Sequence, residues 1–193
     1  MTAEPLPLES WMEESGALRR GHFLLSSGLH SPAYVQCALL LESPHRARRI
    51  GRALAEPMAE WEADSVLSPA LGGLIIGYEV AAALDLPFRF VERVDGQMAL
   101  RRGFRLEAGE RVIVVEDVVT TGRSTREAMD VARRAGAEIC AVASILDRTG
   151  GEDTFEIPYV RLLEIDLPTF NAEACPLCQM GEAFDQPGSR PLS

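Results

Sequence analysis

The stretch from Arg111 to Thr125 constrains this chain more than any other, because it joins a buried strand to a helix through a short polar loop. It begins with the β-branched run VIVV, which is typical of a strand buried on both faces of a parallel sheet. Glu116 and Asp117 follow, and after two valines comes the loop TTGRST. Helix-forming residues run on from Arg126. The order strand, loop, helix is the building unit of an α/β fold.

This loop has the chemistry of a phosphate site. Backbone N–H groups at the start of a helix point outward and attract anions, and Gly122 permits the tight turn that brings them together. Hydroxyl groups line the same loop at Thr120, Thr121, Ser124 and Thr125. The two carboxylates before the loop can accept hydrogen bonds from vicinal sugar hydroxyls, as the acidic residue of dinucleotide sites does. The stretch therefore predicts a site for a ribose 5-phosphate.

The same stretch resembles the signature of the type I phosphoribosyltransferases that binds PRPP (5-phosphoribosyl 1-diphosphate). There, four apolar residues, two acids and two apolar residues precede Thr-Thr-Gly-x-Ser/Thr. The resemblance implies that Glu116 and Asp117 hold the ribose 2- and 3-hydroxyls and act in catalysis, and that the loop holds the 5-phosphate. The PRPP-binding residues that it assigns here are Glu116, Asp117, Val118, Val119, Thr120, Thr121, Gly122, Arg123 and Ser124. A buried strand with a Ser/Thr helix cap is the simpler alternative.

Residues 21–36 are predicted to form two short strands around a Ser-Ser-Gly turn. Residues 21–34 follow the pattern G-x-F-x-L-x-S-G-x-x-S-x-x-Y, which resembles the hood that lies over the pyrimidine in orotate phosphoribosyltransferases. The resemblance assigns orotate binding to Ser26, Ser27, Gly28, Tyr34, Thr120 and Arg148. Many members of that family carry a Lys where Ser26 stands. A hairpin that only covers a sheet edge is the alternative interpretation of this hood (residues 21–36).

A second strand–loop–helix unit is expected from Ser65 to Leu84, with paired glycines in the loop SPALGG. In the resembled family the equivalent loop binds pyrophosphate through backbone N–H groups, often with a strained peptide. The residues of this pyrophosphate loop are Ala70, Leu71, Gly72 and Gly73. Gly72 stands where many relatives have a Lys, and a plain turn between strand and helix is the alternative.

An Arg-rich flap is expected from Glu92 to Arg105, with a turn at Asp95-Gly96. In the resembled enzymes a mobile loop here closes over the active site, usually that of the neighbouring subunit, and brings cations to the pyrophosphate. The family pattern R-K-x-x-K-x-H-G is missing, because this flap has Arg residues and no His. The resemblance assigns Arg93 to PRPP binding and Arg101 and Arg102 to catalysis. It also implies a homodimer with shared active sites.

The chain from residue 137 onward carries two further features. The strand expected over 137–146 leads into Asp147 and Arg148, and in orotate phosphoribosyltransferases an Arg in this Leu-Asp-Arg setting binds the orotate carboxylate. Residues 167–193 are expected to be loosely structured, with Cys175-Pro-Leu-Cys178 inside them. This CPLC is half of a zinc knuckle, but four ligands are needed and the His residues lie far upstream. Inert packing is therefore favoured over a zinc, redox or dimer-bridging role.

Length and charge limit the classes of protein to which this chain can belong. At 193 residues one domain is expected, with an N-terminal helix and hood at 1–43, a core at 44–166 and a tail at 167–193. No run approaches the ~20 apolar residues of a membrane span, and MTAEPLPLES is no signal peptide, so a cytoplasmic protein is expected. A net charge of −10 argues against nonspecific nucleic-acid binding. All 19 basic residues are Arg, so any cation that neutralises phosphate must be Arg or a metal.

Together these features predict an α/β protein of the type I phosphoribosyltransferase fold. It would have a central parallel sheet flanked by helices, a small N-terminal hood and a flap hairpin. The resemblance implies transfer of phosphoribose from PRPP to orotate in pyrimidine biosynthesis, with Mg²⁺ held mainly through PRPP. Two alternatives stay open: a phosphoribosyltransferase for another base, and a noncatalytic regulator that senses PRPP on the same fold.

Overall fold

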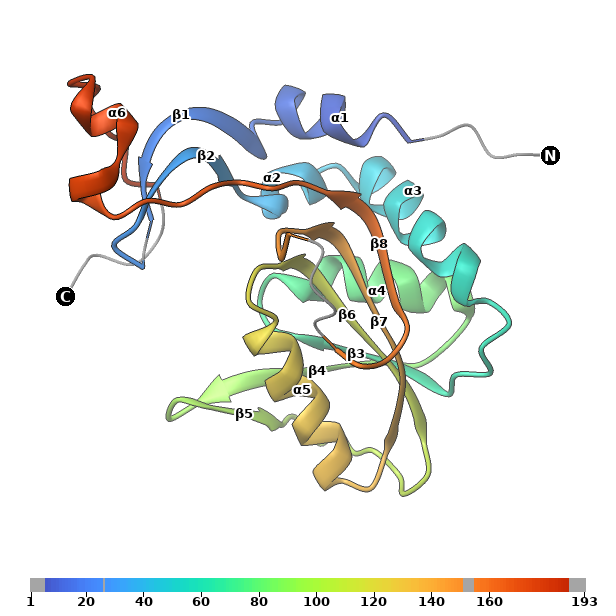
Figure 1. Ribbon diagram of the computed structural model, residues 1–193. Coiled ribbons are helices and arrows are strands. Elements are labelled where there is room, and N and C mark those ends of the chain that lie inside the picture. The colour runs from blue at the N-terminus through green and yellow to red at the C-terminus, as the bar shows by residue number, and fades with distance from the viewer. Residues whose placement is uncertain (1–5, 26, 151–154, 188–193) are drawn as a thin grey trace. The chain divides into compact units, whose positions relative to one another are not determined.

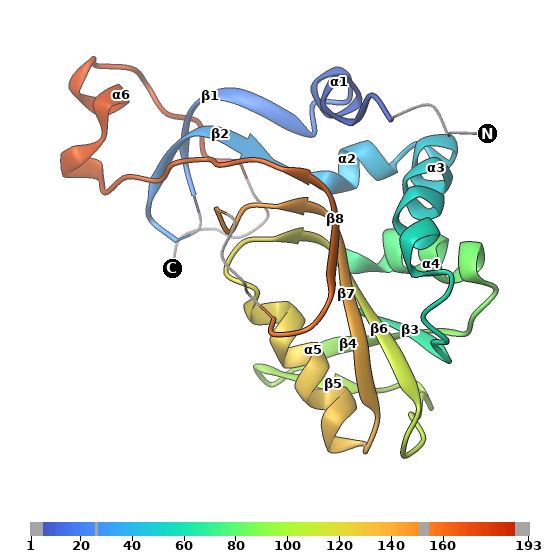
Figure 2. The ribbon, with the colours of Figure 1, turned by 45° about the vertical axis from the view of Figure 1, so that its right-hand side comes forward.

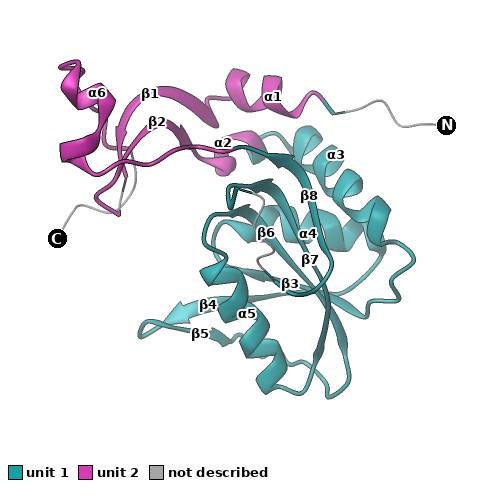
Figure 3. Ribbon diagram, viewed as in Figure 1, with its two compact units in different colours: residues 1–6, 41–165 teal, residues 7–40, 166–193 magenta. Residues whose placement is uncertain are grey.

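A computed structural model of the chain describes residues 6–25, 27–150 and 155–187 (Figure 1). The chain divides into two compact units, coloured separately in Figure 3. Unit 1 comprises residues 1–6 and 41–165, and unit 2 comprises residues 7–40 and 166–193. That the chain forms a single domain stays a prediction, but the hood and the tail fall together in unit 2.

Unit 1 is built on a six-stranded sheet in the order β5-β4-β3-β6-β7-β8. Its strands are β3 (Ser65–Pro69), β4 (Phe88–Val94), β5 (Gln97–Leu100), β6 (Arg111–Val119), β7 (Glu138–Asp147) and β8 (Tyr159–Glu164). Neighbouring strands run parallel, except that β4 and β5 form an antiparallel hairpin. The predicted α/β fold with a parallel sheet and a flap hairpin is therefore confirmed.

Three helices cover this sheet: α3 (Pro44–Ala55), α4 (Gly73–Leu84) and α5 (Arg123–Arg134). Figure 2 shows α5 on one face of the sheet and α4, followed outward by α3, on the other. The α-helix does not continue past Ala55, because Pro57 lacks the N–H that an α-helix needs. The chain tightens instead into the 3₁₀ turn η1 (Glu56–Met58). Gly51 lets α3 approach α4 closely, since a Cβ there would lie 2.6 Å from Cβ of Glu79.

The run VIVV forms the centre of the core, as predicted. Val112 and Val114 pack with Met129 and Ala132 of α5 in one cluster, and all are 0–1% exposed. Ile113 and Val115 alternate onto the opposite face and are equally buried. Burial on both faces holds β6 rigid, and this rigidity positions the residues at its carboxyl end.

Unit 2 holds α1 (Leu8–Glu14), the antiparallel pair β1 (Leu18–Leu24) and β2 (His30–Val35), η2 (Ala172–Ala174) and α6 (Pro176–Gln179). The two hood strands are confirmed. Helix α1 ends at Glu14, because Gly16 adopts a φ of 71° and the chain enters β1 soon afterwards. A short helix, α2 (Cys37–Leu41), follows the hood at the boundary of the two units and was not predicted.

The tail is ordered against the hood, contrary to the prediction of loose structure. Phe170 and His30 exchange backbone hydrogen bonds of 2.8 Å. Farther along, the N–H of Leu24 donates to the carbonyl of Asp185 at 2.9 Å, and Arg19 forms an ion pair with the Asp185 carboxylate at 2.7 Å. Residues 166–187 therefore complete the hood. Among the described residues, no helix combines the length and the apolar character needed to span a membrane.

Candidate active site

The two acids of the central stretch lie in the last part of β6. The strand continues through both acids and ends at Val119. Glu116 pairs with Ser144 of β7, and Val119 pairs with Asp147. The acids therefore sit at the carboxyl end of the central strands, where ligands bind in open α/β sheets.

Burial and proximity tune these two acids. Glu116 is only 7% exposed. Its Oε1 accepts a hydrogen bond from the backbone N–H of Asp117 at 3.2 Å. Oδ1 of Asp117 accepts the N–H of Val118 at 2.9 Å. Burial raises the pKa of both carboxyls, and for Glu116 repulsion from Asp117 raises it further. A ligand that donates hydrogen bonds or brings positive charge would relieve this repulsion.

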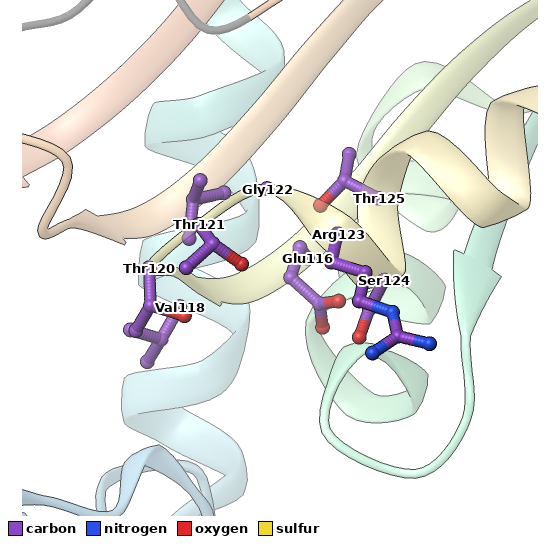
Figure 4. A pocket seen from close by; sticks show the side chains of 9 residues that line it. Glu116, Val118, Thr120, Thr121, Gly122, Arg123, Ser124 and Thr125 are labelled. Atoms are coloured by element: carbon purple, nitrogen blue, oxygen red, sulfur yellow. The ribbon is translucent and has the colours of Figure 1, made fainter. Parts of the chain in front are cut away.

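A pocket lies between the end of β6 and the start of α5 (Figure 4). Its lining consists of Glu116, Val118, Val119, Thr120, Thr121, Gly122, Arg123, Ser124 and Thr125. Gly122 turns the chain with a φ of 68° and precedes the first residue of α5. The free backbone N–H groups of the first helical turn thus face a pocket lined by hydroxyl groups. This geometry suits a phosphate.

The pyrophosphate loop lies directly against the acids. A Cβ built on Gly72 would stand 2.6 Å from Oδ1 of Asp117, and one on Gly73 would stand 2.9 Å from the carbonyl oxygen of Val115. Only glycine permits these approaches without a shift. The Ala70–Leu71 peptide bond in the same loop is cis. The structure therefore brings the two predicted phosphate loops together around one acidic pair.

This contact predicts that Gly72→Ala damages the site without unfolding the protein. Gly72 has a φ of −57°, which alanine tolerates, so the only conflict is the new methyl group against the Asp117 carboxylate. Displacing a catalytic group by about 1 Å can cost on the order of 100-fold in rate. We expect kcat/KM to fall at least tenfold by this reasoning, with the melting temperature little changed. Unaltered kinetics would show that Asp117 moves aside freely.

The flap forms the hairpin of β4 and β5, with its turn at Asp95-Gly96 as predicted. Arg93 donates to the Gly96 carbonyl at 2.6 Å and pairs with Glu127 of α5. Arg123 also pairs with Glu127, at 3.0 Å. Although burial alone would raise the pKa of Glu127, its bonds to both arginines lower it. Arg93 is therefore held against the helix that begins at the pocket.

The two predicted catalytic arginines differ in their surroundings. Arg102 pairs with Glu92 at 3.0 Å and lies over the Phe90 ring. Arg101 is exposed and has no ion pair within the part of the chain that the structure describes. Arg101 is thus, like Arg105, an exposed flap cation without an ion pair among the described residues.

Arg148 lies immediately beside the pocket loop. Its N–H donates to the carbonyl of Val119 at 2.8 Å. Its Nε is buried and, among the described residues, meets no hydrogen-bond partner. Burial lowers the pKa of this guanidinium, and a buried donor without a partner is costly. An anionic ligand would supply the missing acceptor.

The predicted orotate-binding residues divide between the two units. Thr120 and Arg148 belong to unit 1, whereas Ser27, Gly28 and Tyr34 belong to the hood in unit 2. Gly28 turns the hood with a φ of 81°, and Tyr34 packs on Phe23 with ring centroids 5.9 Å apart. Ser26 lies outside the described residues. The role of the hood in binding stays a prediction.

One functional residue of this region was not identified from the sequence. Glu127 joins Arg93 of the flap to Arg123 of the pocket. Its spacing of four from Arg123 is a recognised helix pairing and was a usable signal. The ion pair between Glu127 and Arg93 joins residues 34 positions apart, so no local sequence pattern indicated it.

Comparisons with known proteins agree with this geometry. Residues 38–178 match the family model described as a phosphoribosyl transferase domain. An orotate phosphoribosyltransferase of Thermotoga maritima is 47% identical over 94% of this chain and 97% of its own length. One of Carboxydothermus hydrogenoformans is 50% identical over 92% and 94%. The crystal structure of an orotate phosphoribosyltransferase from Aeropyrum pernix is similar with a TM-score of 0.66 and 27% identity, covering 82% of this chain and 93% of that one.

Proposed function

This chain belongs to the orotate phosphoribosyltransferase family, and we propose that it converts orotate and PRPP to orotidine 5′-monophosphate and pyrophosphate in pyrimidine biosynthesis. The observation that carries the proposal is the meeting of three parts at the end of β6. These are the acidic pair, the hydroxyl-lined pocket of α5, and the glycine loop that touches Asp117. Each part fits a different portion of PRPP.

The proposed mechanism needs no side-chain nucleophile. The 5-phosphate occupies the pocket at the start of α5, and the ribose hydroxyls donate to Glu116 and Asp117. As the bond from the anomeric carbon to pyrophosphate breaks, positive charge develops on the sugar, as in glycoside cleavage. The two carboxylates stabilise that charge, and their mutual repulsion is relieved at the same moment. N1 of orotate then attacks the opposite face, and inversion at the anomeric carbon results.

We propose Mg²⁺ as the cofactor, held mainly by PRPP. Hard oxygen ligands suit this ion, which commonly keeps one or two carboxylates together with substrate phosphates and water. The buried carboxylate of Glu116 and the half-buried carboxylate of Asp117 fit such a set, because neither forms an ion pair among the described residues. When bound, the ion would neutralise charge on the leaving pyrophosphate.

We also propose that two copies of the chain form a dimer. Helix α4 is apolar around most of its circumference, yet Ile75 and Tyr78 are 45% and 61% exposed. Leu71, one turn before Ile75, is 82% exposed. An exposed stripe of large apolar side chains is the usual mark of a protein interface. A second copy is the partner because homodimers are the commonest soluble oligomers and the resembled enzymes share sites across a dimer.

A complementation experiment tests whether the flap serves the neighbouring subunit. One inactive variant carries Asp117→Asn, and the other carries Arg101→Ala with Arg102→Ala. If the flap crosses the dimer, half of the sites in each mixed dimer are intact. Random mixing in equal amounts should therefore restore about a quarter of wild-type activity, given twofold symmetry. Activity is measured before and after subunit exchange.

Mass spectrometry under native conditions confirms that exchange has occurred. If mixed dimers form and activity does not recover, the flap acts within its own subunit or has no catalytic role. Wild-type protein mixed with either variant is the control for losses during exchange.

The proposed reaction itself is tested by the loss of orotate absorbance. We expect the loss to require PRPP and Mg²⁺ and to yield pyrophosphate in equal amount. Adenine, hypoxanthine and uracil in place of orotate should give little turnover. Turnover of a purine would identify a transferase for another base, and PRPP binding without turnover of any base would identify a regulator.

A further inference from the structure

Four side chains with metal-binding atoms converge in unit 2, whereas the residues assigned to catalysis belong to unit 1. They form the His–Cys cluster, which consists of His22, His30, Cys175 and Cys178. One nitrogen or sulfur atom from each lies within 4.8 Å of the others. His22 lies on β1 and His30 on β2, while the two cysteines flank the start of α6. The fold thus brings two histidines of the β1–β2 hairpin together with two cysteines of the tail, although more than 140 residues of chain separate them.

The spacing within the cluster fits tetrahedral coordination. With Zn–N near 2.0 Å and Zn–S near 2.3 Å, a tetrahedron places N and S about 3.5 Å apart. Sγ of Cys175 lies 3.5 Å from Nε2 of His22, and Sγ of Cys178 lies 3.7 Å from the same nitrogen. Sγ of Cys178 lies 3.3 Å from Nδ1 of His30. The two ring nitrogens, 2.6 Å apart, would have to separate to reach about 3.3 Å.

The surroundings of the cluster also suit a metal. Nδ1 of His22 lies 2.8 Å from the Glu182 carbonyl, so it carries the proton and leaves the lone pair on Nε2, the atom that faces His30 and both cysteines. Histidines that bind metals are usually oriented by such a bond. His22, His30 and Cys175 are 0–5% exposed, and the Phe184 ring packs edge-on against both imidazoles. Cys178 is half-buried, so three of the four side chains are shielded from water.

We propose that the His–Cys cluster binds one Zn²⁺ as a structural site. Binding forms two Zn–N and two Zn–S bonds and releases the two thiol protons to solvent. Two thiolates then balance the charge of the ion, so the buried site is neutral overall. Two imidazoles and two thiolates fill all four positions, which leaves none for a substrate. The ion would fasten the tail to both hood strands.

A disulfide is the main competing use of this cysteine pair. All four cysteines of the chain are free thiols in the structure. A disulfide would consume both sulfur ligands, whereas His22 and His30 can contact each other and His22 the Glu182 carbonyl with or without it. A zinc site uses all four side chains in one coordination sphere.

The first test is metal content. Untagged protein purified without chelator should retain about one zinc ion per chain, the stoichiometry of a single tetrahedral site, by plasma mass spectrometry. The Cys175→Ser/Cys178→Ser variant should retain almost none. Cys140→Ser is the matched control, because Cys140 lies on β7 in unit 1 and its sulfur contacts the Val112 carbonyl. It should bind as much zinc as the wild type.

The second test substitutes Co²⁺ into the wild-type protein, which remains informative if the double variant fails to fold. Coordination by two sulfurs and two nitrogens should give the intense visible bands of tetrahedral cobalt and thiolate charge-transfer absorption. Chelation should lower the melting temperature of the wild type by on the order of 10 °C. The proposal is overturned if reduced wild-type protein takes up neither ion, or if it is isolated with a Cys175–Cys178 disulfide under reducing conditions.

Discussion

Replacing Asp117 with Asn is expected to lower kcat at least tenfold while the fold is retained. The amide oxygen of Asn can still accept the N–H of Val118, a bond of 2.9 Å in the structure, so the loop keeps its shape. The substitution removes one of the two charges that would stabilise the positive sugar in the transition state. It also removes repulsion with Glu116, whose pKa should therefore fall. Steady-state kinetics with both substrates saturating measures the effect.

The matched control for this substitution is Asp130→Asn. Asp130 is an exposed carboxylate on α5 that pairs with Arg133 at 3.6 Å, and it lines no part of the pocket. Its replacement should leave kcat unchanged. If Asp117→Asn behaves like the control, Asp117 does not act on the reacting sugar.

Arg148→Ala should raise the KM for orotate far more than the KM for PRPP. The buried Nε of Arg148 meets no acceptor among the described residues, and the orotate carboxylate would provide one. Losing a charge-assisted hydrogen bond costs about 1.5–3 kcal/mol, which corresponds to roughly 10- to 150-fold in affinity. Initial rates over a grid of both substrate concentrations separate the two KM values.

Two further variants sharpen this test. Arg148→Lys keeps the charge but loses the planar fork, so its KM should lie between those of the wild type and Arg148→Ala. Arg134→Ala removes an exposed Arg near the far end of α5 and should change neither KM. Equal increases in both KM values for Arg148→Ala would contradict a role in recognising orotate.

Local patterns predicted the parts of this fold that local forces decide. The run from Val112 to Val115 became the buried centre of β6 because β-branched residues without polar interruption suit a sheet covered on both faces. Asp95 and Gly96 became the flap turn because both accept a positive φ. The N-terminal helix expected within residues 1–43 is short, because Gly16 adopts a positive φ just after Glu14.

Contacts between distant segments could not be predicted in the same way. The sequence places Gly72 and Asp117 in separate strand–loop–helix units, and only the pairing of β3 with β6 brings their loops into contact. Likewise, zinc was disfavoured because the histidines lie far from Cys175 and Cys178 along the chain. The structure overturns that reason, since the tail pairs with both hood strands and closes the distance.

The pairing of tail and hood also sets an order for folding during synthesis. Residues 7–40 leave the ribosome first, but the segment that completes unit 2 begins only at residue 166. Unit 1, which is continuous from 41 to 165, can fold in the interval, as domains generally do during translation. Its sheet and phosphate pocket would then be complete before the hood has its partner. The residues proposed to hold PRPP would thus be in place while the hood still lacks its tail segment.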